Sequence, residues 1–258
     1  MSPRAPGLPP AIGACLFDLD GVLTQTAKVH AAAWKQTFDE FLRERGERAE
    51  RAGREGSDLT PFDAVADYER YVDGKPRYDG VESFLDARGI ELPQGAEQDP
   101  PSAETVHGLG NRKNEIVLRM IRENGVEAYE GSVRYVRAVR AAGLATAVVS
   151  SSANARDVLA AANIEDLFDT VVDGALAQRE HLRGKPAPDT FLAGARALAV
   201  EPAQAAVFED ALAGVQAGRA GRFGAVVGVD RLGQADALRA HGADIVVADL
   251  GELLERVS

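Results

Sequence analysis

The sequence predicts an α/β protein with a doubly wound, mostly parallel sheet and an inserted helical segment. Two observations predict this fold class. From about Gly131 onward, short apolar runs alternate with segments of helical periodicity, which is typical of a mostly parallel sheet with helices on both faces. An earlier apolar run, residues 12–17, has no strand-like partner before that point. It most simply joins the later sheet, so the helical stretch between them becomes an insertion.

The expected strands are short apolar runs that end at polar residues. The first, residues 12–17, is closed by Asp18 and suits a buried parallel strand. The later strands are expected at residues 145–149, 170–172, 205–208, 225–229 and 245–247. Segments with helical spacing lie near residues 132–142, 154–162, 188–199, 211–220 and 233–241. Between residue 27 and about residue 101 the pattern is mostly helical, with charged and Pro/Gly interruptions.

This order predicts a discontinuous chain organisation. Residues 1–26 and 127–258 are expected to form a Rossmann-like α/β core, and residues 27–126 an α-helical cap domain. Two charged segments of the cap have no assigned role. Residues 43–56 alternate Arg and Glu and indicate an exposed helix end and loop, whereas residues 94–105 contain two adjacent prolines and several acids and indicate a long loop.

Composition excludes several classes of protein. The chain has 258 residues, which is long enough to bury a core without a disulfide or zinc staple. A net charge of −11 disfavours binding to nucleic acid or to an anionic membrane surface. The single cysteine, Cys15, lies in an apolar run and excludes an internal disulfide framework. No run reaches the ~18 apolar residues of a membrane span, and residues 1–10 lack the apolar stretch of a signal peptide. We expect a cytoplasmic protein.

Two pairs of acidic residues close predicted strands. Asp18 and Asp20 follow the first strand, and Glu209 and Asp210 end the strand that begins at Ala205. In an open α/β sheet, ligands bind beyond the carboxyl ends of the strands. An ordinary Asp-Gly turn is the structural alternative for the first pair.

Hydroxyl groups and a lysine extend this set. Ser150 and Ser152 follow the second strand, and Asn154 opens a helix there. Hydroxyls and free backbone N–H groups at a helix N-terminus form an anion site, although a serine N-cap needs only one of them. Lys185 lies between a glycine and a proline, where an exposed loop lysine is the alternative. Together these residue types predict a metal-assisted phosphoryl-transfer site, because Mg²⁺ prefers hard oxygen ligands and cations neutralise a phosphoryl group.

The order Asp-x-Asp-Gly, Ser, Lys-Pro, Glu-Asp, with a helical segment after the first motif, resembles the haloacid dehalogenase superfamily. Within it the chain resembles the β-phosphoglucomutases over nearly its whole length. The resemblance implies that Asp18 is a nucleophile that forms an aspartyl phosphate and that Asp20 is a general acid/base. It also implies that Asp18, the backbone carbonyl of Asp20, Glu209 and Asp210 hold Mg²⁺.

The same resemblance implies a set of substrate contacts. Ser150 and Lys185 are implied to bind the transferring phosphate. The other implied substrate-binding residues are Thr26 at the cap hinge, His30, Trp34 and Lys113 on cap helices, Gly74 and Arg77 in a loop that grips the second phosphate, and Ser152 and Asn154 in the core. Each of the three residues on cap helices has a structural alternative. His30 could be a helix histidine with its hydrogen bonds satisfied, Trp34 could pack in the core without contacting substrate, and Lys113 could lie on a solvated helix face.

Two features bear on how the second phosphate is held. Arg77 could instead pair with Asp73 or Asp79. The mutases carry a lysine at the position of Ala153, and its absence weakens the expected grip on that phosphate unless Lys75 compensates.

The first functional hypothesis is therefore a β-phosphoglucomutase-like enzyme, monomeric or weakly self-associating, whose partner is a small sugar phosphate. The alternative is a sugar-phosphate phosphatase with the same nucleophile, in which water ends the cycle. A dehalogenase or phosphonate hydrolase is disfavoured by Asp20, which those relatives generally lack. An inactive scaffold is disfavoured because the complete set of polar core residues is present.

Overall fold

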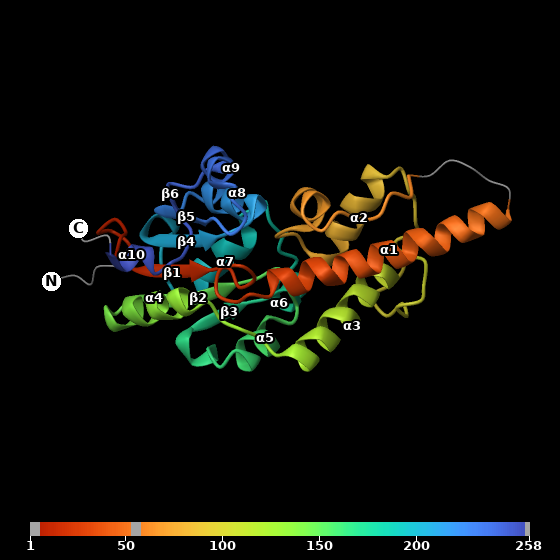
Figure 1. The fold of residues 1–258 in the computed structure, drawn as a ribbon. Coiled ribbons are helices and arrows are strands. Elements are labelled where there is room, and N and C mark those ends of the chain that lie inside the picture. Colours follow the sequence, from red (N-terminus) through yellow and green to blue (C-terminus); the bar gives the residue numbers. More distant parts are fainter. Residues whose placement is uncertain (1–5, 53–57, 256–258) are drawn as a thin grey trace. The chain divides into compact units, whose positions relative to one another are not determined.

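The structure is a computed structural model that describes residues 6–52 and 58–255 (Figure 1). The chain divides into two compact units. The core unit comprises Met1–Thr26 and Val126–Ser258, and the cap unit comprises Ala27–Gly125. No helix among the described residues has both the length and the apolar composition that crossing a bilayer requires.

The core unit is built on one sheet of six parallel strands in the order β3-β2-β1-β4-β5-β6. The strands are β1 Ala14–Phe17, β2 Ala145–Val149, β3 Thr170–Val172, β4 Ala205–Glu209, β5 Ala225–Val229 and β6 Ile245–Val247. This confirms the predicted fold class, with the first strand of the chain at the centre of the sheet. In the register, Phe17 lies beside Val148 of β2 and Phe208 of β4. The residues that follow these three strands therefore all lie at the end of the sheet where the carboxyl termini of the strands meet.

Helices cover both faces of this sheet because successive side chains of a buried strand point to opposite sides. Phe17 of β1 meets Tyr135 of α4 at a ring-centroid distance of 6.4 Å. On the other face, a Cβ added at Gly194 of α7 would lie 2.8 Å from Leu16 Cδ2. The helices of the core unit are α4 Glu130–Ala141, α5 Ala155–Ala161, α6 Gly174–Arg179, α7 Asp189–Ala197, α8 Leu212–Ala220, α9 Ala235–His241 and α10 Glu252–Glu255. Of these helices in the described part of the chain, only the short α6 and α10 have no counterpart among the predicted helices.

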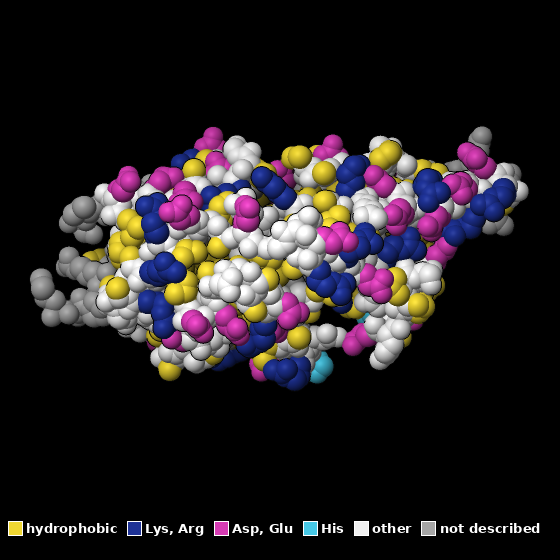
Figure 2. All heavy atoms as spheres, turned by 60° about the horizontal axis from the view of Figure 1, so that its bottom comes forward, with side chains coloured by type: hydrophobic (Ala, Val, Ile, Leu, Met, Phe, Trp, Pro, Cys, Tyr) yellow, Lys and Arg dark blue, Asp and Glu magenta, His cyan; other side chains and the backbone are white. Residues whose placement is uncertain are grey.

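The cap unit is helical. It contains α1 Ala27–Arg51, a π-helix at Tyr68–Val72, α2 Arg77–Ala87 and α3 Val106–Asn124. Its interior is aromatic, and the rings of Phe38 and Phe84 stack with centroids 4.0 Å apart. Residues 94–105 form neither helix nor strand, as predicted, whereas residues 43–51 continue α1 and residues 53–56 lie outside the described part of the chain. Acidic and basic side chains are interspersed over the face drawn in Figure 2.

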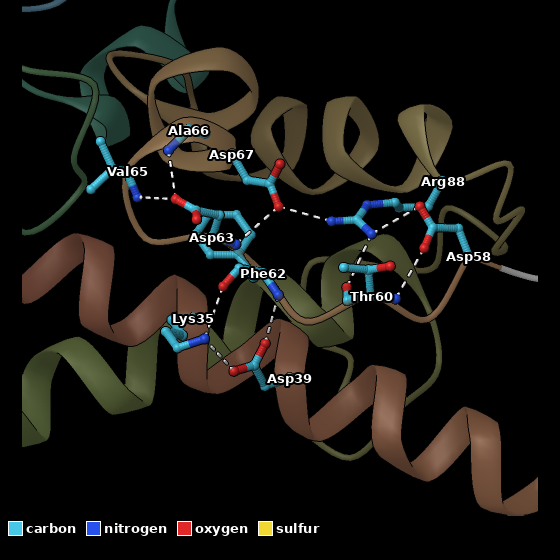
Figure 3. Close-up of polar contacts among 10 residues, drawn as sticks. All are labelled: Lys35, Asp39, Asp58, Thr60, Phe62, Asp63, Val65, Ala66, Asp67 and Arg88. Atoms are coloured by element: carbon cyan, nitrogen blue, oxygen red, sulfur yellow. Dashed lines mark hydrogen bonds and ion pairs between the residues drawn. The ribbon is translucent and has the colours of Figure 1, made fainter.

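Residues 58–67, which lead into the π-helix, form hydrogen bonds and ion pairs with charged side chains of α1 and of the end of α2 (Figure 3). Arg88, at the end of α2, donates hydrogen bonds to Asp58, to Asp67 and to the carbonyl of Thr60. The exposed fraction of the Arg88 side chain is 8%, and its guanidinium lies 4.9 Å from the ring centroid of Phe84. Arg88 therefore joins the start of this segment to the aromatic interior of the cap.

We expect Arg88→Ala to lower the free energy of unfolding of the protein by about 1–3 kcal/mol, because it leaves a partly buried carboxylate and a carbonyl without their donor. Urea unfolding followed by circular dichroism measures the change. The matched control is Arg43→Ala, which removes an exposed partner of Glu47 and should leave the unfolding midpoint unchanged. Equal midpoints for all three proteins would contradict the role given to Arg88.

Candidate active site

The two acidic pairs predicted from the sequence meet at the carboxyl edge of the core sheet. The backbone N–H of Asp18 donates to the carbonyl of Phe208, which keeps β1 and β4 together up to their ends. Gly21 has a positive φ of 88°, and a Cβ added there would lie 1.7 Å from Asp210 Oδ2. Glycine is required at this turn because the carboxylate of Asp210 packs directly against it.

Lys185 is the only lysine of the core unit, and its ammonium group lies between two carboxylates. Its Nζ donates to Asp18 Oδ1 at 2.5 Å, to Glu209 Oε1 at 2.6 Å and to the carbonyl of Val149 at 3.2 Å. Burial alone would lower the pKa of Lys185, but Asp18 and Glu209 outweigh it and raise the pKa above its ordinary value. The loop lysine of the sequence analysis is therefore a buried, charged group of the site, 2% exposed.

Asp18 keeps one oxygen for further chemistry. Burial raises the pKa of Asp18 and Lys185 opposes the rise, so the carboxylate form depends on nearby positive charge. Among the described residues, Asp18 Oδ2 accepts no hydrogen bond, whereas Oδ1 is held by Lys185. Lys185 therefore fixes the orientation of the Asp18 carboxylate through one oxygen and leaves the other without a donor among the described residues.

The donor set at this edge is made of oxygen atoms and carries excess negative charge, which suits a divalent cation such as Mg²⁺. The four acidic residues of the two pairs are accompanied in the core by the single ammonium of Lys185. No group of three acidic, histidine or cysteine side chains among the described residues stands in ligating geometry as the side chains lie. Glu209 explains part of this, because it accepts hydrogen bonds from Lys185 at Oε1 and from the N–H of Ala211 at Oε2.

Asp20 is oriented by two threonines. Thr26 Oγ1 donates to Asp20 Oδ1, and Thr24 Oγ1 lies 2.7 Å from Thr26 Oγ1. Since the hydroxyl of Thr26 gives its single proton to the carboxylate, Thr24 is the donor to Thr26. Thr24 Oγ1 also donates to the carbonyl of Leu19 at 3.1 Å, so its single proton is shared between the two acceptors. Thr26 was predicted at the hinge, but its bond to Asp20 and the part played by Thr24 were not anticipated.

The serines that follow β2 brace a turn rather than cap the helix. Ser150 Oγ accepts from the N–H of Ser152, and Ser152 Oγ accepts from the N–H of Asn154. Asn154 precedes α5 without a side-chain capping bond. Among the described residues Ser150 Oγ donates no hydrogen bond, so its hydroxyl proton stays available for an incoming oxygen atom. The plain N-cap alternative does not describe these residues.

Three predicted cap residues lie together inside the cap unit. Lys113 Nζ lies 2.7 Å from His30 Nδ1 and 4.9 Å from the ring centroid of Trp34. Lys113 is 6% exposed, so it does not lie on a solvated face. Trp34 also stacks on Phe38 at 5.1 Å and contributes to the cap interior. This packing agrees with the structural alternative for Trp34, and its contact with a substrate stays a prediction.

Arg77 begins α2 and has no acidic partner. Its Nη2 donates to Tyr78 Oη at 3.0 Å, and among the described residues no carboxylate lies within ion-pair distance of its guanidinium. Pairing with Asp73 or Asp79 is thus excluded in this structure.

Gly74, in the loop before Arg77, has a φ of 68°, which explains a glycine at this position. Lys75 donates to Ser83 Oγ at 2.8 Å, and burial lowers the pKa of Lys75. Neither observation tests whether Lys75 replaces the lysine that the mutases carry at the position of Ala153, so this stays a prediction.

Two residues of the β5–α9 loop that sequence analysis missed hold the backbone that follows β1 and β4. Arg231 Nε donates to the carbonyl of Gly21 at 2.8 Å, and the Arg231 guanidinium lies 3.6 Å from the ring centroid of Tyr129. Gln234 Nε2 donates to the carbonyl of Asp210 at 3.2 Å. No sequence motif marks these residues, since their partners are backbone atoms far away in the chain.

Comparison with known proteins gives the class to which this fold and site belong. The model of haloacid dehalogenase-like hydrolases matches residues 12–222. The chain is 57% identical over 254 residues to a β-phosphoglucomutase of Mycobacterium tuberculosis, covering 97% of this chain and 95% of that one. It is 31% identical over 241 residues to a β-phosphoglucomutase of Bacillus subtilis, covering 93% and 91%. A crystal structure of β-phosphoglucomutase from Clostridium difficile superimposes with a TM-score of 0.70 at 25% identity, covering 94% and 93%.

The chain belongs to the haloacid dehalogenase superfamily. Within it, the chain is a member of the β-phosphoglucomutase-like family and an enzyme of the phosphotransferase or isomerase kind. The resemblance inferred from the sequence is confirmed.

We expect Lys185→Ala to lower the free energy of unfolding by about 3–5 kcal/mol, because it leaves Asp18 and Glu209 buried without the ammonium that compensates them. Chemical denaturation measures the loss, with the exposed Lys28→Ala as the control that should match the wild type. A Lys185→Ala protein within about 1 kcal/mol of the wild type would show that the buried pair is not a main stabilising element.

Proposed function

We propose that the protein acts as a β-phosphoglucomutase, interconverting β-glucose 1-phosphate and glucose 6-phosphate through a bound 1,6-bisphosphate. The observation that carries this proposal is the 57% identity to the mycobacterial enzyme over nearly the full length of both chains. The polar core residues that the chemistry needs all lie at one edge of the sheet, which supports the assignment further.

In the proposed reaction Asp18 is the nucleophile. Its free oxygen forms a bond to phosphorus while the ester P–O bond breaks, and the product is an aspartyl phosphate. Lys185 and Ser150 contact the oxygens of the transferring group and hold its charge. The phosphoryl group then passes from Asp18 to the free 6-hydroxyl of β-glucose 1-phosphate, which restores the carboxylate and forms the 1,6-bisphosphate. Transfer of the 1-phosphoryl group of this bisphosphate to Asp18 leaves glucose 6-phosphate and the aspartyl phosphate for the next cycle.

Asp20 supplies and removes the proton. It protonates the leaving sugar oxygen in one half-reaction and takes the proton from the attacking hydroxyl in the other. In the structure its carboxylate is held by Thr26. Thr26 is therefore proposed to orient the acid/base.

Mg²⁺, when bound, would neutralise charge on the transferring phosphoryl group. Asp18, Asp210 and the backbone carbonyl of Asp20 would hold it. Glu209 would join them through a second lone pair of a carboxylate oxygen, since each of its oxygens already accepts one hydrogen bond. The donor chemistry and the close packing of Asp210 on Gly21 support this assignment.

The remaining contacts are proposed to serve the rest of the substrate. Arg77, in the loop that begins at Gly74, would bind the phosphate that is not being transferred, together with Ser152 and Asn154 of the core. His30, Trp34 and Lys113 of the cap would contact the sugar phosphate. Exclusion of water from the aspartyl phosphate would favour transfer of its phosphoryl group to a sugar over hydrolysis.

The mutase and phosphatase hypotheses are separated by incubating the protein with Mg²⁺, β-glucose 1-phosphate and a trace of 1,6-bisphosphate. Glucose 6-phosphate and free phosphate are followed together. We expect glucose 6-phosphate to accumulate with little free phosphate, and Asp18→Asn to lose both products because an amide is no nucleophile. Free phosphate released in step with substrate loss would instead establish the phosphatase.

Arg77→Ala should reduce turnover of β-glucose 1-phosphate by about 10²-fold or more, because a charge-assisted bidentate contact to phosphate is lost. Turnover of p-nitrophenyl phosphate should fall far less, since that substrate has no second phosphate. Steady-state kinetics on both substrates measures the difference, with Arg119→Ala on α3 as a control. Equal losses on both substrates would show that Arg77 serves only the fold.

A further inference from the structure

Residues 94–105 form the charged loop that has no role in the sequence analysis, and they lie against the start of α3. We propose that this loop, acting through Asn111 and Tyr78, sets the position of the Arg77 guanidinium and thereby determines specificity for substrates that carry a second phosphate. The inference rests on the proposed function of Arg77 as the ligand of that phosphate. We refer to Tyr78, Asn111 and residues 94–105 as the Arg77 support.

The Arg77 guanidinium is held by neutral groups only. Tyr78 Oη accepts the hydrogen bond from Nη2, and the guanidinium carbon lies 4.9 Å from the Tyr78 ring centroid. Nε of Arg77 is buried and has no hydrogen-bond partner among the described residues. A neutral acceptor and an aromatic face orient a cation without cancelling its charge. No negatively charged neighbour in the described chain therefore compensates the guanidinium, and it can attract an anionic ligand more strongly than it would beside a carboxylate.

Tyr78 is itself locked in place. Its hydroxyl donates to Asn111 Oδ1 at 3.0 Å, and its ring stacks on His107 with centroids 4.0 Å apart and planes 24° apart. A Cβ added at Gly110 would lie 2.6 Å from Tyr78 Cδ1 and 3.4 Å from Arg77 Cγ. The glycine on α3 thus makes room for both side chains, and the hydroxyl has one defined direction.

Asn111 connects Tyr78 to the loop. Its Nδ2 donates to the carbonyls of Glu97 and Asp99, both at 2.9 Å. Because the two amide protons bind loop carbonyls, the amide oxygen must point toward Tyr78. The bonds run without a break from the loop backbone through Asn111 and Tyr78 to Arg77.

Hydrogen bonds within residues 94–105 and to α3 hold the conformation of this loop. Thr105 Oγ1 donates to Asp99 Oδ2 at 2.6 Å and also accepts from the first turn of α3. Arg112 Nε donates to the carbonyl of Pro101 at 2.9 Å. Gly95 has a φ of 76°, a conformation that favours glycine. Bonds at several points along its length therefore hold the carbonyls that Asn111 contacts.

The test begins with Tyr78→Phe, which removes one hydroxyl and keeps the ring. We expect the ratio of kcat/KM for β-glucose 1-phosphate to that for p-nitrophenyl phosphate to fall about fivefold, as loss of one hydrogen bond predicts. The change should lie mainly in KM. Asn111→Ala should lower the same ratio. Tyr71→Phe is the matched control, because Tyr71 is a cap tyrosine outside the Arg77 support, and it should leave the ratio unchanged.

A double-mutant cycle separates positioning of Arg77 from a general structural effect. In an Arg77→Ala background, adding Tyr78→Phe should change the ratio by less than about twofold, since the group that Tyr78 positions is gone. A fivefold loss that persists in that background, or an unchanged ratio for Tyr78→Phe alone, overturns the inference while leaving the function of Arg77 intact. An unchanged ratio for Arg77→Ala alone overturns the proposed function of Arg77 and the inference with it.

Discussion

The buried contact of Lys185 with Asp18 and Glu209 is the interaction on which the rest of the core site depends. An ammonium group between two carboxylates is stable in the protein interior only if all three groups are placed accurately. The parallel register of β1 and β4 supplies this accuracy, because it ends both strands at the same level. One oxygen of Asp18 is held by Lys185, and the other is available for the nucleophilic role proposed for this residue.

The positive charge of Arg77 in the cap has different surroundings from that of Lys185 in the core. In the core, the charge of Lys185 is compensated by acidic neighbours, and this contact stabilises the folded site. In the cap, Arg77 is oriented by a hydroxyl and an aromatic face and keeps its charge. The difference follows from the roles proposed for the two residues. Lys185 orients the carboxylate of Asp18, whereas Arg77 must exchange water for a phosphate group. Neutral support keeps that exchange favourable.

Much of the fold could be predicted because its signals are local. The strand after residue 144 and the strand beginning at Ala205 were expected within one residue of their ends, since short apolar runs between polar residues specify buried parallel strands. Asp20 and Glu209 could likewise be placed at strand ends. Their hydrogen-bond partners could not, because Thr26 and Lys185 reach them through turns and packing that periodicity does not encode.

The sequence by itself determined the class of fold, the insertion after the first strand and the edge of the sheet where polar residues gather. These depend on alternation of apolar and polar residues and on the rule that parallel strands end together. Only the tertiary structure decided that Arg231 holds the carbonyl of Gly21 and that Asn111 joins residues 94–105 to Tyr78. Such contacts depend on side-chain geometry between distant segments, which becomes defined only when the helices and loops of each unit have packed.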